Sequence, residues 1–273
     1  MKGHIENLHN VSPTLHRIAN TILCNYSMTT TPNLVNGRMG VCLFLYEYAR
    51  LTGIKEYEDI ADEMIDLIFK VLRKGQNEDN ISSLSGVGIG IIYLITHQFL
   101  EDTDEQDSLK EVDEYLLNII ETAKVSSEMV VQSALYFIYR YIHYNKGLDK
   151  GYCYRLAGQL VRLFQNQEDS GDNESKLSAY ILHNAMLICK TNAESEESPY
   201  RDNMVFFDTL YLKSIEQITA ENIWYNVLLG NETVECLVDE KYLGVLCRNC
   251  FYDADRVVGI LCSYGLMLMN RNN

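Results

Sequence analysis

The sequence of 273 residues contains only three prolines and a single tryptophan. Proline interrupts helices because it lacks the backbone N–H and its ring clashes with the preceding turn, so long proline-free stretches favour helices. No window of about 18 apolar residues occurs, which argues against a transmembrane helix. The first residues also lack the apolar core of a signal peptide. We therefore expect a cytoplasmic protein whose eight cysteines are reduced thiols.

Positive charge is also scarce, since 23 lysines and arginines face 38 aspartates and glutamates, for a formal net charge of −15. Nucleic acids and anionic membrane surfaces repel such a protein, so we expect neither as a partner. The charge allows a peptide or protein partner. Hydrophobic residues make up 47% of the chain, which is enough for a substantial core. We expect a single domain over residues 1–273, with the polar residues 1–11 disordered.

Two similar stretches combine clustered glycines with apolar runs, the first beginning at Asn36 and the second at Leu84. Glycine inside a helix costs roughly 1 kcal/mol relative to alanine, so glycines at the same point of two helices need a reason. A helix without side chains at that point can approach a neighbouring helix closely. Further helix starts follow at a loose period of about 45 residues, which is typical of stacked helical hairpins.

Helices of two kinds alternate along the chain. Residues 54–72 have one apolar and one charged face, as an outer helix does, whereas the glycine-bearing helices are apolar nearly all round and are expected to be inner helices. The pattern predicts an all-α fold in which six inner helices are surrounded by six outer helices in a ring, although an open solenoid satisfies it too. Inner helices are expected to start near Gly37, Gly86, Ser127, Leu177, Glu221 and Val257.

Over residues 34–100 the chain resembles the lanthionine synthetase C-like family. The resemblance implies an α/α toroid of about six helical hairpins. Enzymatic members bind zinc at the mouth of the ring, and the zinc activates a peptide cysteine for addition to a dehydrated serine or threonine. The matching residues are Asn36-Gly37-Arg38-Met39-Gly40, Tyr46, Tyr48-Ala49-Arg50, Thr52-Gly53, Tyr57, Leu84-Ser85-Gly86-Val87-Gly88-Ile89-Gly90 and Tyr93-Leu94-Ile95, with Val258-Gly259-Ile260-Leu261 near the end.

The zinc ligands of that family do not carry over. The family uses a cysteine before a tyrosine-glycine or similar pair, and then an adjacent cysteine-histidine pair followed by glycine. Here no cysteine is followed by histidine, and Cys262-Ser263-Tyr264-Gly265 is only a distant echo of the first motif. A catalytic zinc site needs three protein ligands and one open position, so we expect no cofactor. The lone Cys247-Arg248-Asn249-Cys250 is a weak signal whose role stays open.

Polar residues at the predicted starts of the inner helices form the candidate binding site. In a toroid these starts gather at one mouth, where free N–H groups and helix dipoles favour anionic or polar groups. We expect Arg38 and Arg256 to face this mouth and to meet acidic groups, either internal carboxylates or those of a partner. No catalytic residue is predicted. The candidate ligand-binding residues are Asn36, Arg38, Ser85, Glu128, Asn222, Trp224, Asp255 and Arg256.

Three functions remain open from the sequence. The first, implied by the resemblance, is a protein that binds a ribosomally made peptide or assists its modification, without the zinc-dependent cyclase activity. The second is an active cyclase with rearranged zinc ligands. The third is a helical scaffold for protein–protein interaction.

Overall fold

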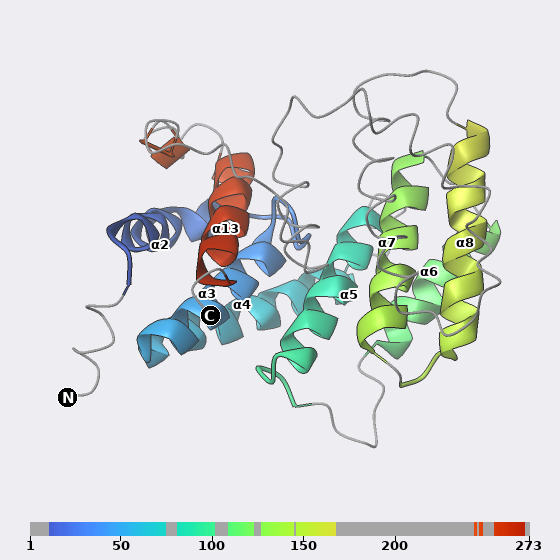
Figure 1. The fold of residues 1–273 in the computed structure, drawn as a ribbon, viewed down its shortest axis with the longest axis horizontal. Coiled ribbons are helices and arrows are strands. Elements are labelled where there is room, and N and C mark those ends of the chain that lie inside the picture. The colour runs from blue at the N-terminus through green and yellow to red at the C-terminus, as the bar shows by residue number, and fades with distance from the viewer. Residues whose placement is uncertain are drawn as a thin grey trace. The chain divides into compact units, whose positions relative to one another are not determined.

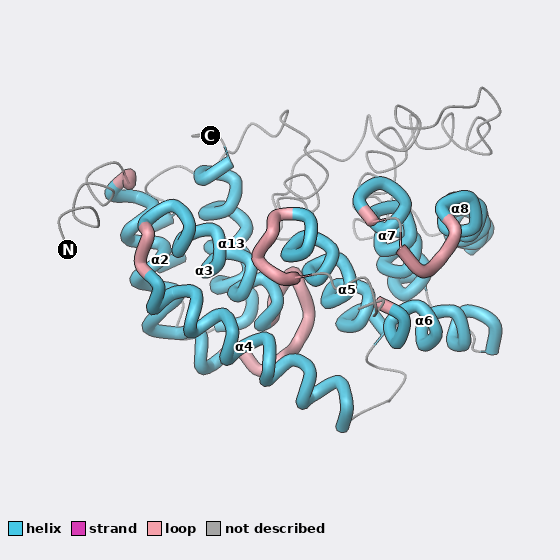
Figure 2. Tube along the Cα trace, turned by 90° about the horizontal axis from the view of Figure 1, so that it is seen from below, coloured by secondary structure: helices cyan, strands magenta, loops and turns pink. Residues whose placement is uncertain are grey.

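The computed structural model describes residues 11–74, 81–101, 109–122, 127–144, 146–167, 243–244, 246–247 and 254–270. Every regular element within these residues is helical (Figures 1 and 2), which confirms the all-α prediction. The elements are α2 (Pro13–Asn25), the 3₁₀ helix η1 (Tyr26–Met28), α3 (Arg38–Thr52), α4 (Lys55–Lys74), α5 (Ile81–Thr96), α6 (Lys110–Thr122), α7 (Ser127–His143), α8 (Lys150–Gln167) and α13 (Ala254–Asn270).

The helix starts differ from the sequence predictions at two places. Helix α5 begins at Ile81 rather than near Gly86, so its glycines lie inside the helix and not at its start. The apolar periodicity of this segment predicts an outer helix from Tyr154, whereas α8 begins at Lys150, because the carboxylate of Asp149 accepts a hydrogen bond of 2.9 Å from the backbone N–H of Tyr152. The helices expected to start near Leu177 and Glu221 lie outside the described residues.

The described part of the chain contains no helix with the length and hydrophobicity that a membrane span requires. Its contacts divide the chain into two compact units, residues 1–77 with 219–273 and residues 78–218. We describe each unit by itself.

In the first unit, α3 and α4 form an antiparallel hairpin. Every residue from Met39 to Ala49 in α3 is buried, as expected of an inner helix. Gly53 closes the turn at a φ of 71°, a left-handed conformation that glycine adopts without strain. The hydroxyl of Tyr46 donates a hydrogen bond across the hairpin to the carboxylate of Asp62. Helix α4 buries a single stripe, as an outer helix does: Ala61, Met64, Ile65 and Ile68.

Helix α13 comes from the other end of the sequence and packs against α3 and α2 (Figures 1 and 2). A Cβ on Gly259 would lie 2.2 Å from the carbonyl oxygen of Val35, and a Cβ on Gly265 would lie 2.4 Å from Cε2 of Phe44. From the first of these contacts to the second, the position advances toward the C-terminus in both chain segments, so α3 and α13 run parallel. The first and last predicted inner helices are therefore neighbours, as ring closure requires. The complete ring of six hairpins remains a prediction.

In the second unit, α5 and α7 are the inner helices. Residues 85–94 of α5 and 133–140 of α7 are all buried. A Cβ on Gly88 would lie 2.4 Å from Cε2 of Tyr136, so the two helices touch where α5 lacks a side chain. At their C-terminal ends, loss of solvation and the charges of His97 and Lys150 lower the pKa of His143 to about 4. Gly88 lies beside Tyr136, and His97 lies near His143, further toward the C-terminus of each helix. Helices α5 and α7 therefore also run parallel.

A buried ion pair joins α6 to α7 in this unit. The Nη2 atom of Arg140 lies 2.6 Å from Oδ2 of Asp113, and the hydroxyl of Tyr136 donates a hydrogen bond of 2.6 Å to Oδ1 of the same carboxylate. Burial and the Asp113 charge hold the pKa of Tyr136 well above its ordinary value, so the hydroxyl remains a donor. Arg140 also donates to the carbonyl oxygen of Lys146, at 3.0 Å. These bonds fix how the outer helix meets the inner one.

Replacing Gly88 with alanine tests the contact between α5 and α7. The added Cβ would meet the ring of Tyr136, which its hydrogen bond to Asp113 holds in place. We expect a loss of roughly 1–3 kcal/mol in the free energy of unfolding, measured by urea denaturation. Gly151→Ala is the control, because its Cβ would approach only Oδ1 of Asp149, just before α8, and Nη1 of Arg155, at 3.1 and 3.3 Å. Equal stability of the two variants would contradict a close contact at Gly88.

Replacing Arg140 with methionine tests the buried ion pair. The substitution leaves the carboxylate of Asp113 buried without its counter-charge, so we expect a loss of about 3–5 kcal/mol in the free energy of unfolding. Changing Asp113 to leucine as well should recover part of this loss, since no buried charge then remains. Lys110→Met is the control, because Lys110 forms only an exposed pair with Glu114, at 3.9 Å. A double variant less stable than Arg140→Met alone would show that the pair is not the cause.

Candidate functional site

The segment before α3 folds into a loop that closes over the start of that helix. The backbone N–H of Arg38 donates to the carbonyl oxygen of Thr31 at 2.9 Å, and the N–H of Met39 donates to that of Asn33 at 3.2 Å. The hydroxyl of Thr31 donates to the carbonyl oxygen of Asn36 at 3.0 Å. These two N–H groups of α3 are therefore bonded to the loop and are not free to bind a ligand.

The side chain of Arg38 also forms a hydrogen bond to this loop. Its Nε atom donates a hydrogen bond of 3.0 Å to the carbonyl oxygen of Thr29. A cation beside a helix N-terminus is unfavourable unless a negative group compensates it. Here a carbonyl dipole provides part of that compensation. Arg38 is half-buried, so part of the guanidinium remains available to another group.

Asn36 lies where the loop meets α13. A Cβ on Gly259 would lie 2.6 Å from Oδ1 of Asn36, so only glycine fits at this point of α13. The Oδ1 atom of Asn36 and the Oγ1 atom of Thr29 are buried and have no hydrogen-bond partner among the described residues. A buried polar atom without a partner costs free energy. The loop therefore contains two buried polar atoms whose hydrogen bonds are not made within the described residues.

The structure brings together only some of the residues that the sequence singled out. Asn36 and Arg38 share the loop, and Asp255 and Arg256 occupy the first turns of α13, the helix that packs on it. Ser85 is buried inside α5, in the other unit. Asn222 and Trp224 lie outside the described residues, as do the side chains of Glu128, Asp255 and Arg256.

Sequence reasoning missed Thr29, Thr31 and Gly259 as parts of this site. The threonines lie in a stretch without hydrophobic periodicity, which predicts only a loop. Their contribution comes from backbone carbonyls and from one hydroxyl, which have no signature in residue type. Gly259 belongs to the matched segment near the end of the chain, and its role depends on a contact with Val35 that the sequence does not encode locally.

The buried thiols in the described part of the chain do not suit the zinc that the family implies. Zinc binds thiolates, whereas burial raises the pKa of Cys42 far above its ordinary value and that of Cys153 to about 11. Cys262, from the echo of the family motif, is completely buried within α13. Within the described residues, no three histidine, cysteine, aspartate or glutamate side chains are placed to hold a metal ion. These residues therefore do not fit a zinc centre.

Comparison with protein families identifies the class of protein that this helical arrangement belongs to. The model of the lanthionine synthetase C-like proteins matches residues 29–185, which is more than half of the chain. The chain therefore belongs to the lanthionine synthetase C-like family. No curated protein and no solved structure showed a significant match to the chain. The family match begins at Thr29, the residue whose carbonyl anchors Arg38, and extends well beyond the 34–100 segment that carried the sequence resemblance.

Replacing Gly259 with alanine tests the contact between α13 and the loop. The new Cβ would meet the backbone carbonyl of Val35, which cannot rotate away as a side chain could. We expect a loss of roughly 1–3 kcal/mol in stability and faster hydrogen exchange at the amides of Arg38 and Met39. Gly244→Ala is the control, since its Cβ would meet only the flexible end of Arg17, at 3.0 Å. Unchanged exchange in Gly259→Ala would show that α13 does not hold this loop.

Proposed function

We propose that this protein binds a ribosomally made peptide and assists its modification without carrying out zinc-dependent thioether formation. Membership in the lanthionine synthetase C-like family supports a role related to peptide modification. One observation carries the finer proposal: the family's opening motif is built into an ordered loop against α13, while two thiols of the inner and outer helices, Cys42 and Cys153, are buried with raised pKa values. On this proposal peptide binding is retained and zinc-dependent thiol activation is not.

The loop before α3 is the part of the proposed site with defined geometry. Asn36 has a buried amide oxygen, and the guanidinium of the half-buried Arg38 can donate hydrogen bonds to an acidic or carbonyl group of a peptide. Such groups recognise an extended peptide through its backbone and need no particular side chain. The other proposed contacts are Ser85, Glu128, Asn222, Trp224, Asp255 and Arg256.

Two other functions make different predictions. A helical scaffold would bind a folded protein through its outer surface and would be indifferent to changes in this loop. An active cyclase with rearranged ligands would carry about one zinc per chain and would consume a peptide thiol.

A fluorescent library of synthetic dodecapeptides, each with one cysteine and one dehydroalanine, tests the proposal. We expect selected peptides to bind by fluorescence anisotropy and to keep their free thiol at the uncatalysed rate, as measured with a thiol reagent. Arg38→Gln and Asn36→Ala should each weaken binding by about tenfold, the loss expected for a charge-assisted or buried hydrogen bond. Arg155→Gln, an exposed arginine of α8, should leave binding unchanged.

The alternatives appear as contrary results of the same experiment. Accelerated loss of peptide thiol, with about one zinc per chain by elemental analysis, would replace the proposal with an active cyclase. Peptide binding that is equally strong in Arg38→Gln, Asn36→Ala and Arg155→Gln would show that the loop is not the binding site. Urea denaturation of each variant establishes that a loss of binding is not a loss of fold.

A further inference from the structure

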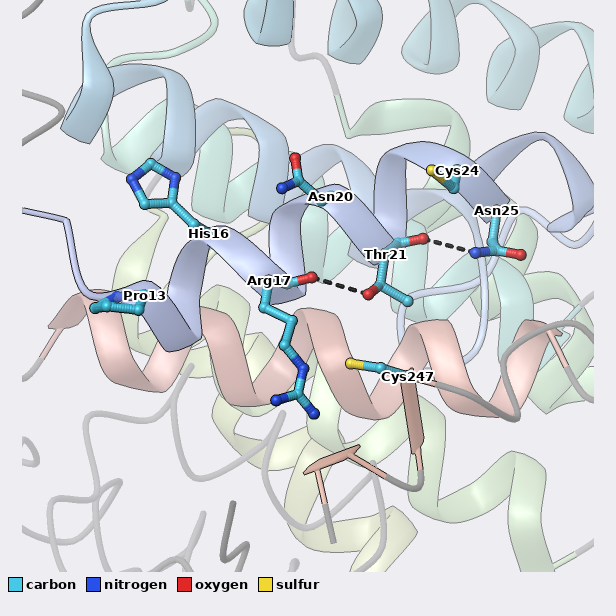
Figure 3. Close-up of a pocket in the computed structure, with 8 residues that line it drawn as sticks. All are labelled: Pro13, His16, Arg17, Asn20, Thr21, Cys24, Asn25 and Cys247. Carbon is cyan, nitrogen blue, oxygen red and sulfur yellow. Dashed lines mark hydrogen bonds between the residues drawn. The ribbon is translucent and has the colours of Figure 1, made fainter. Parts of the chain in front are cut away.

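The first unit contains a pocket that neither the family motif nor the proposed peptide site uses. It has a volume of about 640 Å³ and lies between α2 and a short helical segment that includes Cys247 (Figure 3). The α2 residues in its wall come from the polar face of that helix, opposite the buried residues Leu15, Ile18 and Ile22. Both walls belong to the same compact unit.

The wall of this pocket carries positive charge in a strongly acidic protein. Arg17 lies in the wall, and no aspartate or glutamate is among the lining residues of the described chain. No carboxylate within the described residues forms an ion pair with the Arg17 guanidinium. The chain as a whole has a formal charge of −15.

The guanidinium of Arg17 lies close to Gly244, near Cys247 in the sequence. A Cβ on Gly244 would lie 3.0 Å from Nη2 of Arg17, so the guanidinium rests where this glycine lacks a side chain. Cys247 follows Gly244 by three residues in a helical segment, which places both on one side of that segment. Figure 3 shows Arg17 and Cys247 on the same side of α2.

Neighbouring polar groups of α2 are already occupied within the helix. The hydroxyl of Thr21 donates a hydrogen bond of 2.8 Å to the carbonyl oxygen of Arg17. The side-chain amide of Asn25 donates a hydrogen bond of 2.8 Å to the carbonyl oxygen of Thr21 (Figure 3). His16 is also engaged in a hydrogen bond, because its Nδ1 atom lies 2.7 Å from the hydroxyl oxygen of Tyr48. The guanidinium of Arg17 is thus the principal group that can recognise a ligand here.

We propose that this pocket binds a carboxylate-bearing ligand, which pairs with Arg17 beside the free thiol of Cys247. A guanidinium presents paired donors that match the two oxygens of a carboxylate. The proposal is independent of the peptide site at the start of α3, because it uses other residues and other helices.

The reactivity of the Cys247 thiol toward an anionic and a neutral reagent measures the local charge. We would measure its rates of alkylation by anionic iodoacetate and by neutral iodoacetamide, read at this residue by mass spectrometry. Arg17→Gln should lower the iodoacetate-to-iodoacetamide rate ratio roughly threefold, an order-of-magnitude expectation for the loss of one unit charge near the thiol in water-like surroundings. Arg17→Lys should largely preserve the ratio. Arg155→Gln, which removes the same charge elsewhere, should leave it unchanged. A ratio that is equal in Arg17→Gln and the unmodified protein would overturn the proposal.

Ligand chemistry is tested by protection of the same thiol. N-acetylglycine should slow the reaction of Cys247 with iodoacetamide, whereas the neutral N-acetylglycinamide should not, and Arg17→Gln should abolish the protection. Equal protection by the acid and the amide would overturn recognition of a carboxylate. Equal protection by inorganic phosphate would also overturn it, in favour of a general anion site. Arg17 is exposed, so its variants are expected to fold, and urea denaturation checks this.

Discussion

Close approach of helices at glycines is the constraint on which the rest of this structure depends. Gly88 admits the ring of Tyr136, Gly265 admits that of Phe44, and Gly259 admits the carbonyl of a loop. At each point a single Cβ would overlap an atom of the neighbouring helix or loop. Contacts this close give dense packing and dispersion attraction along parallel inner helices. Glycine destabilises a helix relative to alanine, but this cost is offset because only a residue without a side chain allows such close packing.

Polar contacts then determine which outer helix meets which inner helix. Tyrosine hydroxyls reach aspartates in both units, from Tyr46 to the exposed Asp62 and from Tyr136 to the buried Asp113. Apolar stripes alone would allow a helix to slide by one turn, whereas a buried carboxylate tolerates only the position that satisfies it. Arg140 adds the strongest such restraint, since its charge is fully buried and paired.

The family membership and the chemistry of the site lead to different conclusions about function. The family fold is present, and its opening motif forms an ordered loop at the start of α3. Cys42 and Cys153 are buried, and burial raises the pKa of each thiol. A fold can host several chemistries, so the function has to be argued from the site itself. The polar groups of the loop before α3 are the basis on which we propose peptide recognition.

The sequence by itself determined the helical class and the kind of each helix. Hydrophobic periodicity separated the outer helix α4 from the inner helices, and Ser12-Pro13 marked the start of α2, where the Ser12 hydroxyl accepts a hydrogen bond from the N–H of Leu15. The glycines marked close contacts but not their partners. Only the tertiary structure paired Gly259 with Val35, and Arg140 with Asp113. These contacts join segments distant in the chain, and local periodicity carries no information about which distant segments meet.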